Sequence, residues 1–199
     1  MRGRPAPEGD GPGLSFSRDL PLTQAAVEFA QERHAGQHRL ADGASFVVHP
    51  LEVASLLERS HYPDHVVAAA VLHDVLEDTD AERSELESRF GPEVSALVAL
   101  VSDDPSIPDE EDRKDFVREQ VRRVGGYAAA VYAADKVSKV RELRFLLFTG
   151  FPEEEAEAKR ERYRKSLAML EETIPESRIV ELLRFELEAL EKLPPHGDA

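Results

Sequence analysis

The spacing of apolar residues predicts helices along almost the whole chain. From about residue 22 to residue 192, apolar side chains recur at three- and four-residue intervals, as on the buried face of an amphipathic helix. Alternating β-branched runs between turn residues, which would indicate strands, are absent from the sequence. The pattern therefore predicts an all-α helical bundle of about eight to ten helices around one core.

Proline, glycine and polar runs divide this pattern into elements. We expect helices at residues 22–33, from about 50, at 63–78, at 79–90, from 92, and at 113–123, 127–148, 153–172 and 176–192. Polar loops should occupy residues 34–45 and 102–112. Thr79 and Glu82 have the spacing of a capping box for the fourth helix.

The two ends of the chain differ in composition from the rest. Residues 1–17 are rich in proline and glycine, and residues 194–199 again begin with proline, so we expect a disordered leader and tail. Residues 18–193 are then expected to form one compact domain, which is an ordinary size for a domain with its own core.

Charge and cysteine content narrow the classes of function. The chain carries 40 acidic and 25 basic residues, for a formal net charge of −15, which disfavours binding to nucleic acid or to an anionic membrane. Because there is no cysteine, a metal ion would need His, Asp or Glu ligands. The sequence shows no signal peptide, and its strongly apolar run, residues 66–72, is too short to cross a bilayer. We therefore expect a cytoplasmic protein.

One helix combines a fully apolar stretch with a group of acids. Residues 66–72 are apolar on every face, which indicates a buried helix, yet His73, Asp74, Glu77 and Asp78 follow directly. Residues four apart share a helix face, and His73 and Asp74 are close enough on the helix to reach one ion. These residues predict either a divalent metal site or a helix end at which acids are merely exposed to solvent.

Two further residues could complete a metal site. His49 opens the second helix, and Asp135 ends the apolar run at residues 130–134. Considered alone, each is more often a hydrogen-bonded core histidine or a salt-bridged acid. Together with His73 and Asp74 they give the order His, His-Asp, Asp, which is far more specific for metal binding.

This order resembles the HD phosphohydrolase superfamily, and more closely the hydrolase domain of RelA/SpoT proteins and the stand-alone small alarmone hydrolases. The resemblance extends from about residue 22 to residue 144. The matching stretches are 34–39 (HAGQHR), 46–50 (FVVHP), 69–79 (AAVLHDVLEDT), 90–94 (FGPEV), 100–104 (LVSDD) and 134–136 (ADK).

The resemblance implies a role for each matching residue. His49, His73, Asp74 and Asp135 would bind one divalent ion, usually Mn²⁺ in this family. Glu77 and Asp78 would orient and deprotonate the attacking water, and Arg39 would lie near a guanine base. The implied reaction removes the 3′-pyrophosphate of guanosine tetra- or pentaphosphate, giving GDP or GTP. An acidic protein needs local cations for such a substrate. The candidates are Arg39, Lys136, Lys139 and Arg141, along with Arg113 and Lys114 after the acidic loop.

Two positions depart from the family pattern, and one of them is Phe46, where the family often has Tyr. The family usually has Asn four residues after its last metal ligand, where this chain has Lys139. Lysine can donate to a phosphate or pair with an acid such as Glu77 or Asp78, but unlike asparagine it cannot accept a hydrogen bond. Two alternatives therefore stay open beside the alarmone hydrolase: a phosphohydrolase of another nucleotide or phosphoester, and a non-catalytic module that senses a nucleotide.

Overall fold

The computed structural model describes residues 19–192, which form nine α-helices. Within this range the β pairing is limited to an isolated bridge between His38 and Ser45. The predicted all-α fold is therefore confirmed. The leader and tail expected at residues 1–17 and 194–199 lie outside the described residues.

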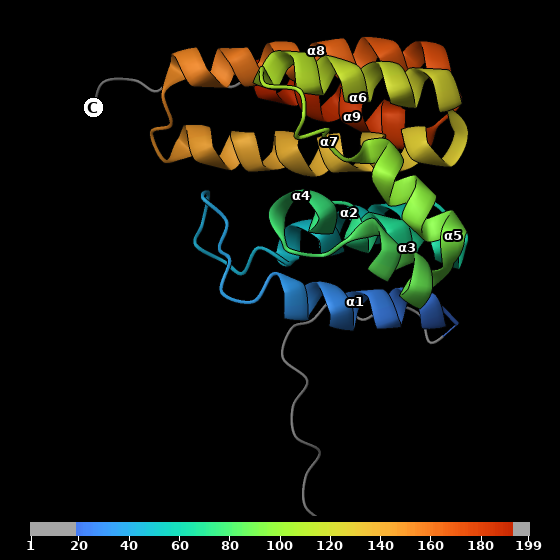
Figure 1. Cartoon of the computed structure of the whole chain (residues 1–199). Coiled ribbons are helices and arrows are strands. Elements are labelled where there is room, and N and C mark those ends of the chain that lie inside the picture. Colours follow the sequence, from blue (N-terminus) through green and yellow to red (C-terminus); the bar gives the residue numbers. More distant parts are fainter. Residues whose placement is uncertain (1–18, 193–199) are drawn as a thin grey trace, which may run out of the picture.

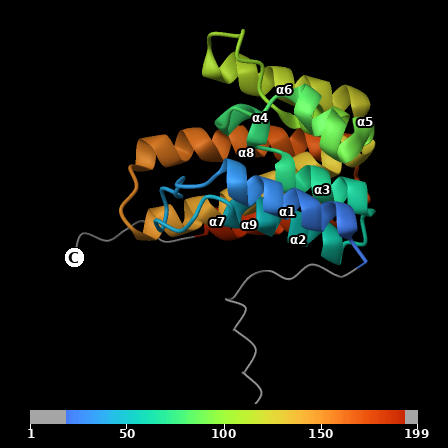
Figure 2. The same cartoon turned by 60° about the horizontal axis from the view of Figure 1, so that its bottom comes forward.

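The helices stack in layers around α7 (Figure 1). Their bounds are α1 Pro21–Arg33, α2 Val48–Arg59, α3 Asp64–Leu72, α4 Val75–Asp78, α5 Arg83–Val101, α6 Glu110–Val124, α7 Gly126–Phe148, α8 Glu153–Thr173 and α9 Arg178–Glu191. Figure 1 shows α7 between a lower group that includes α2, α3 and α4 and an upper group of α6, α8 and α9. The turned view in Figure 2 shows α1 lying across α2 and α3 on the outer side of the lower group.

Two helices form the centre of the core because long parts of their sequences are predominantly apolar on every face. Every residue of α3 from Val66 to Leu72 is buried, and so is α7 from Ala128 to Ser138. Alanines dominate the middle of α7, which lets α2, α3, α5, α6, α8 and α9 all pack against it. The polar residues Asp135, Lys136 and Ser138 of α7 are therefore buried, and they contact other polar side chains.

The predicted continuous helix at residues 63–78 is wrong at its most informative point. The helix stops at Leu72, and a separate turn of helix, α4, begins at Val75. The His73 Nδ1 donates to the Ala70 carbonyl over 2.8 Å. In an unbroken helix that carbonyl would accept from the amide of Asp74, so the imidazole competes with the backbone where the helix ends.

Three other boundaries also differ from expectation. The Thr79–Glu82 capping box is wrong, because the Thr79 hydroxyl donates to the Val75 carbonyl at 2.6 Å and accepts from the amide of Ala81 at 3.1 Å. The helices predicted before and after residue 91 run on as α5 with a kink, where Gly91 has a φ of 86°, a conformation that disfavours side chains. Helix α6 begins at Glu110, inside the predicted 102–112 loop.

Candidate metal centre

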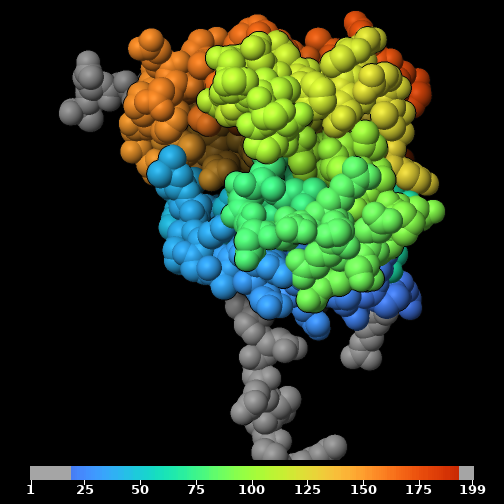
Figure 3. Space-filling model, viewed as in Figure 1, coloured from blue at the N-terminus to red at the C-terminus, as the bar shows by residue number. Residues whose placement is uncertain are grey.

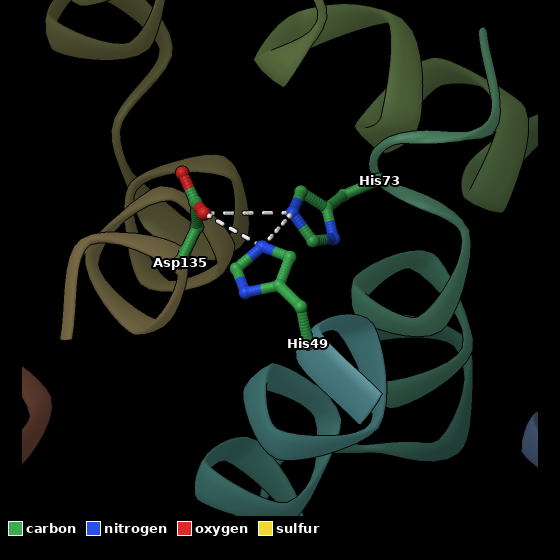
Figure 4. A group of neighbouring side chains, drawn as sticks. All are labelled: His49, His73 and Asp135. Atoms are coloured by element: carbon green, nitrogen blue, oxygen red, sulfur yellow. Dashed lines mark hydrogen bonds and ion pairs between the residues drawn. The ribbon is translucent and has the colours of Figure 1, made fainter. Parts of the chain in front are cut away.

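Side chains from three helical segments converge on one buried point. The Nε2 atoms of His49 and His73 lie 3.3 Å apart, and Asp135 Oδ1 lies 3.2 Å from the first and 3.5 Å from the second. Figure 4 shows the two imidazoles and the carboxylate pointing toward one another from α2, the end of α3 and α7. Atoms bound at about 2.1 Å and at right angles to one ion lie about 3.0 Å apart. The spacing of the three atoms therefore suits a single metal ion.

Asp74 adds a fourth group, a second carboxylate, beside this point. Its Oδ1 lies 3.1 Å from His73 Nε2, and its Oδ2 lies 3.4 Å from His49 Nε2. Asp74 does not belong to the group of ligand atoms that all lie within 4.8 Å of one another, which consists of His49, His73 and Asp135. The structure thus brings all four predicted residues together, with three of them convergent and Asp74 at their edge.

Hydrogen bonds at the far side of each imidazole fix where its proton lies. The His73 Nδ1 faces the Ala70 carbonyl, which can only accept, so this nitrogen carries the hydrogen. The Ser138 hydroxyl donates to Glu52 Oε2 at 2.7 Å, so its oxygen accepts from the His49 Nδ1–H at 3.0 Å. When a metal ion takes the place of any proton on Nε2, imidazoles held in this way present their Nε2 lone pairs to the shared point, as metal ligands do.

The electrostatics of the point also favour a positive charge. The buried Asp135 Oδ1 makes no hydrogen bond of good geometry, and its close neighbours are the two imidazole Nε2 atoms and the Lys139 ammonium. Burial lowers the pKa of His49, but Asp135 and Asp74 outweigh burial and raise this pKa to about 9. Either a proton or a metal ion would satisfy these acceptors. The residues present therefore fit a divalent ion, which the absence of thiolate ligands restricts to the N- and O-binding metals.

Two lysines flank the carboxylate of Asp135. Lys136 Nζ lies 2.6 Å from its Oδ2, and Lys139 Nζ lies 3.0 Å from its Oδ1. Burial raises the pKa of Asp135, but Lys136 and Lys139 outweigh it, so the pKa falls well below the usual range. Of the acids near the site, Lys139 thus pairs with Asp135, and not with Glu77 or Asp78 as one of the two alternatives for this residue had it.

The two acids predicted to act on water differ in their surroundings. Glu77 Oε1 accepts a hydrogen bond from the backbone amide of Asp103 at 2.7 Å. Burial raises the pKa of Glu77, and the negative charges of Asp74 and Asp103 raise it further. Burial and Asp74 likewise raise the pKa of Asp78. A raised pKa suits a carboxylate that must take a proton near neutral pH.

A pocket opens beside the convergent ligands. Its polar lining consists of His73, Asp74, Glu77, Asp103, Lys114, Asp135, Lys136 and Lys139. Figure 3 shows one face of the molecule, with a hollow between blue, green and orange parts of the chain, whereas the residues that line the pocket belong to α4, α5, α6, α7 and the segments next to them. Arg39, although within the described part of the chain, does not line the pocket and pairs instead with Asp42. The structure thus gathers three cations and four acids at one opening, but leaves Arg39 outside it.

Sequence reasoning missed the residues that support His49. Glu52 lies three residues after His49, and Ser138 lies three residues after Asp135, so each is about one helical turn from a metal-ligand candidate. That spacing was a usable signal for a polar partner on the same face. The link between Ser138 and Glu52 joins α7 to α2, however, and only the folded chain shows it.

The fold and the buried histidine–aspartate centre together define a class of protein. A family model described as the HD domain matches residues 26–146, which include all four predicted metal ligands. The chain belongs to the HD domain family.

Relatives that carry the name of an enzyme are similar to the chain over a stretch of comparable length. The guanosine-3′,5′-bis(diphosphate) 3′-pyrophosphohydrolase MESH1 of Danio rerio is 39% identical over 122 residues, which cover 59% of this chain and 66% of the relative. MESH1 of Mus musculus is 37% identical over 131 residues, covering 64% of this chain and 73% of the relative.

A solved structure extends the likeness to the fold. It is described as a metazoan ortholog of SpoT that hydrolyzes ppGpp, and its TM-score against this chain is 0.77 at 28% sequence identity. The match covers 87% of this chain and 97% of that structure. In the described part of this chain, no helix has the length and apolar character needed to cross a membrane.

Proposed function

We propose that the protein is a metal-dependent hydrolase that removes pyrophosphate from the 3′ position of guanosine 3′,5′-bis(diphosphate) and its pentaphosphate analogue. The observation that carries this proposal is the convergence of His49, His73 and Asp135 on one buried point, with Asp74 beside them, in an HD fold. The relatives named above, which share that fold, are called 3′-pyrophosphohydrolases of this nucleotide. The products would be pyrophosphate and GDP or GTP.

The proposed cofactor is one divalent ion, with Mn²⁺ as the expected metal. When bound, such an ion lowers the pKa of water and offsets the negative charge of phosphate oxygens. Two imidazole nitrogens and carboxylate oxygens form a donor set that accepts Mn²⁺, Fe²⁺ or Zn²⁺. Mn²⁺ is proposed over the others because the related hydrolase domains usually use it.

Glu77 is proposed to take the proton from the attacking water. The amide of Asp103 holds one oxygen of this carboxylate, and the residue lines the pocket next to His73 and Asp74. Its raised pKa makes the carboxylate a stronger base than an ordinary glutamate. Asp78 is proposed to help orient the same water. The water oxygen would attack the phosphorus that is bonded to the ribose 3′ oxygen. The bond between this phosphorus and the ribose 3′ oxygen would break.

The lysines of the pocket are proposed to bind the phosphate groups. Lys136 and Lys139 line it from α7, and Lys114 lines it from α6. Each already pairs with an aspartate, so a phosphate oxygen would share or replace that partner. Arg39 is retained as the proposed contact to the guanine base, and its guanidinium pairs with Asp42.

The test is a direct assay of the reaction. The purified protein with Mn²⁺ should release pyrophosphate and GDP in equal amounts from guanosine 3′,5′-bis(diphosphate). An Asp135→Asn protein should release neither above the background, because it loses a charged ligand. If the native protein binds Mn²⁺ but leaves this nucleotide intact, the proposed substrate is wrong.

Lys139 favours a second candidate, a phosphohydrolase that acts on another nucleotide or phosphoester. It places an ammonium group 3.0 Å from Asp135 where the related enzymes usually have an amide. The same assay over a panel of nucleotides would identify such a substrate. A protein that binds nucleotides yet releases no product from any of them would instead be the sensing module.

Location in the cytoplasm and the absence of a nucleic-acid partner remain predictions. They depend on the net charge of −15 and on the sequence of the N-terminus. The chemistry proposed for the site needs only a small anionic substrate.

A further inference from the structure

A chain of polar side chains leads away from the back of the metal centre. The His49 Nδ1–H donates to Ser138, and Ser138 donates to Glu52. Arg141 Nη1 donates to the other Glu52 oxygen at 2.9 Å, and Arg141 Nε donates to Glu186 Oε1 at 2.7 Å. The chain therefore passes from α2 to α7, returns to α2, and reaches α9 through Arg141.

The far end of this chain is an unusual place for an acid. In residues 19–192, the buried carboxylates are Asp74, Asp135 and Glu186, and the first two belong to the metal centre. A buried carboxylate is stable only when it is paired. Both oxygens of Glu186 are occupied, one by Arg141 and the other by Arg144 Nη1 at 2.9 Å. Glu186 is thus held firmly enough to fix Arg141.

The direction of every hydrogen bond in the chain is determined. Arginine can only donate, and the two glutamates can only accept. Glu52 must therefore accept the hydrogen bond that the Ser138 hydroxyl donates, and the Ser138 oxygen must accept a hydrogen bond from the His49 Nδ1–H. As a result, the His49 Nε2 lone pair can face only the metal point. Ser138 is buried, so water cannot easily take over its role.

We propose that Ser138, Glu52, Arg141 and Glu186 are positioning residues that orient His49 for metal binding, and that helix α9 thereby sets the affinity of the site. This inference rests on the metal site of the proposed function. It goes beyond that function because α9 lies outside the segment that matches the HD domain, residues 26–146. Outer partners of this kind typically account for about 10- to 100-fold in metal affinity.

The experiment measures Mn²⁺ binding without substrate, by electron paramagnetic resonance of the free ion. Ser138→Ala removes the acceptor for His49, so its Kd for Mn²⁺ should rise by about 10- to 100-fold. Ser138→Thr keeps the hydroxyl and should restore an affinity near that of the native protein. A purely structural role for Ser138 would not produce this rescue, because Thr adds a methyl group to the buried site and disturbs the packing more than Ala does.

The two glutamates give a graded test that does not depend on Ser138. In Glu52→Gln or Glu186→Gln, the amide keeps one acceptor oxygen and replaces the other by a donor, which breaks one link. Each should raise the Kd by about tenfold, the lower end of the range. Combining Ser138→Ala with Glu52→Gln should add little to Ser138→Ala alone, because both act through His49.

A matched control lies on the same helix. Glu191 of α9 pairs with Arg164 of α8 at 2.8 Å and takes no part in the chain. Glu191→Gln should leave the Kd for Mn²⁺ unchanged. If Glu191→Gln weakens binding as much as Glu186→Gln does, or if folded Ser138→Ala, Glu52→Gln and Glu186→Gln all bind Mn²⁺ as the native protein does, the inference is overturned.

His49→Ala separates this failure from failure of the proposed site. If His49→Ala loses Mn²⁺ while Ser138→Ala, Glu52→Gln and Glu186→Gln bind it as the native protein does, only the inference is overturned. Native Mn²⁺ binding by His49→Ala would overturn both the metal site and the inference. Thermal unfolding of the metal-free variants shows which of them are folded and can be compared.

Discussion

The two histidines of the candidate metal centre are chemically alike, but His73 is supported by a residue close to it in the sequence and His49 by a residue far from it. His73 donates to the carbonyl of Ala70, only three residues earlier in the chain. His49 donates to Ser138, 89 residues away, on another helix. The first support is complete once the end of α3 forms, whereas the second needs α2, α7 and α9 in place. Equal roles at one point can therefore have unequal dependence on the rest of the fold.

Removing either imidazole is the strongest test of this comparison. The affinity for Mn²⁺ should fall by more than about 100-fold in both His73→Ala and His49→Ala, because each change deletes a proposed ligand and not just the residue that supports it. Elemental analysis after gel filtration measures the bound ion. His65→Ala, which changes a histidine of α3 outside the centre, is the control. Native metal content in His73→Ala would remove His73 from the ligand set.

Glu77 extends the contrast to a residue that does not hold the ion. Glu77→Gln should leave Mn²⁺ binding near the native value but lower kcat by about 100-fold or more, the usual scale for a lost general base. Metal titration and steady-state kinetics on the same preparation measure the two quantities. Loss of the ion would instead make Glu77 a ligand, and native kcat would leave it without a catalytic role.

Glu77, like His49, is held by a residue that is distant in the sequence, in this case Asp103. The pH dependence of kcat/KM can detect the influence of that residue. The acid limb of kcat/KM should follow the pKa of Glu77, because only the deprotonated carboxylate is a base. Asp103 raises this pKa and Lys114 lowers it, after the larger effect of burial. Asp103→Asn should therefore move the limb to lower pH, and Lys114→Gln should move it to higher pH. The neighbouring Asp104→Asn should leave it in place; movement of the first two in one direction would contradict the assignment.

The smallest expected effect concerns Asp135, which faces both histidines. Lys139 places a positive charge 3.0 Å from the oxygen that would bind the ion. Lys139→Asn should lower the Kd for Mn²⁺ by up to about tenfold, since like charges at such a distance repel by about 1 kcal/mol or more. Lys165→Asn on the exposed face of α8 controls for net charge. Weaker binding in Lys139→Asn would mean that Lys139 supports the carboxylate instead of competing with the ion.

Local patterns in the sequence were sufficient to predict the fold class and the four residues at the metal point. Helical periodicity depends on residues three and four apart, and the His73-Asp74 pair is adjacent in the chain. The helix break at these residues was not predicted, because it depends on a side chain competing for the Ala70 carbonyl. Helix propensities indicate one helix over residues 63–78, because they do not include competition between a side chain and a backbone amide for the same carbonyl.

Contacts between distant helices explain the rest of what the sequence could not predict. Glu186 belongs to a C-terminal helix without a recognisable motif, and its position is consistent with an ordinary exposed acid of an amphipathic helix. Only the packing of α9 on α7 brings it to Arg141 and buries it. Lys139 was placed near the site by its helical spacing, but its choice of Asp135 over Glu77 or Asp78 depends on side-chain directions within the folded pocket.

The location of Glu186 in the chain has a consequence for biosynthesis. Ribosomes make proteins from the N-terminus at about 5–20 residues per second, so α9 follows every proposed metal ligand out of the exit tunnel. A nascent chain thus possesses His49, His73, Asp74 and Asp135 before it possesses the residue that anchors Arg141. We expect such a chain to capture metal weakly until α9 docks, so that tight loading coincides with completion of the polypeptide.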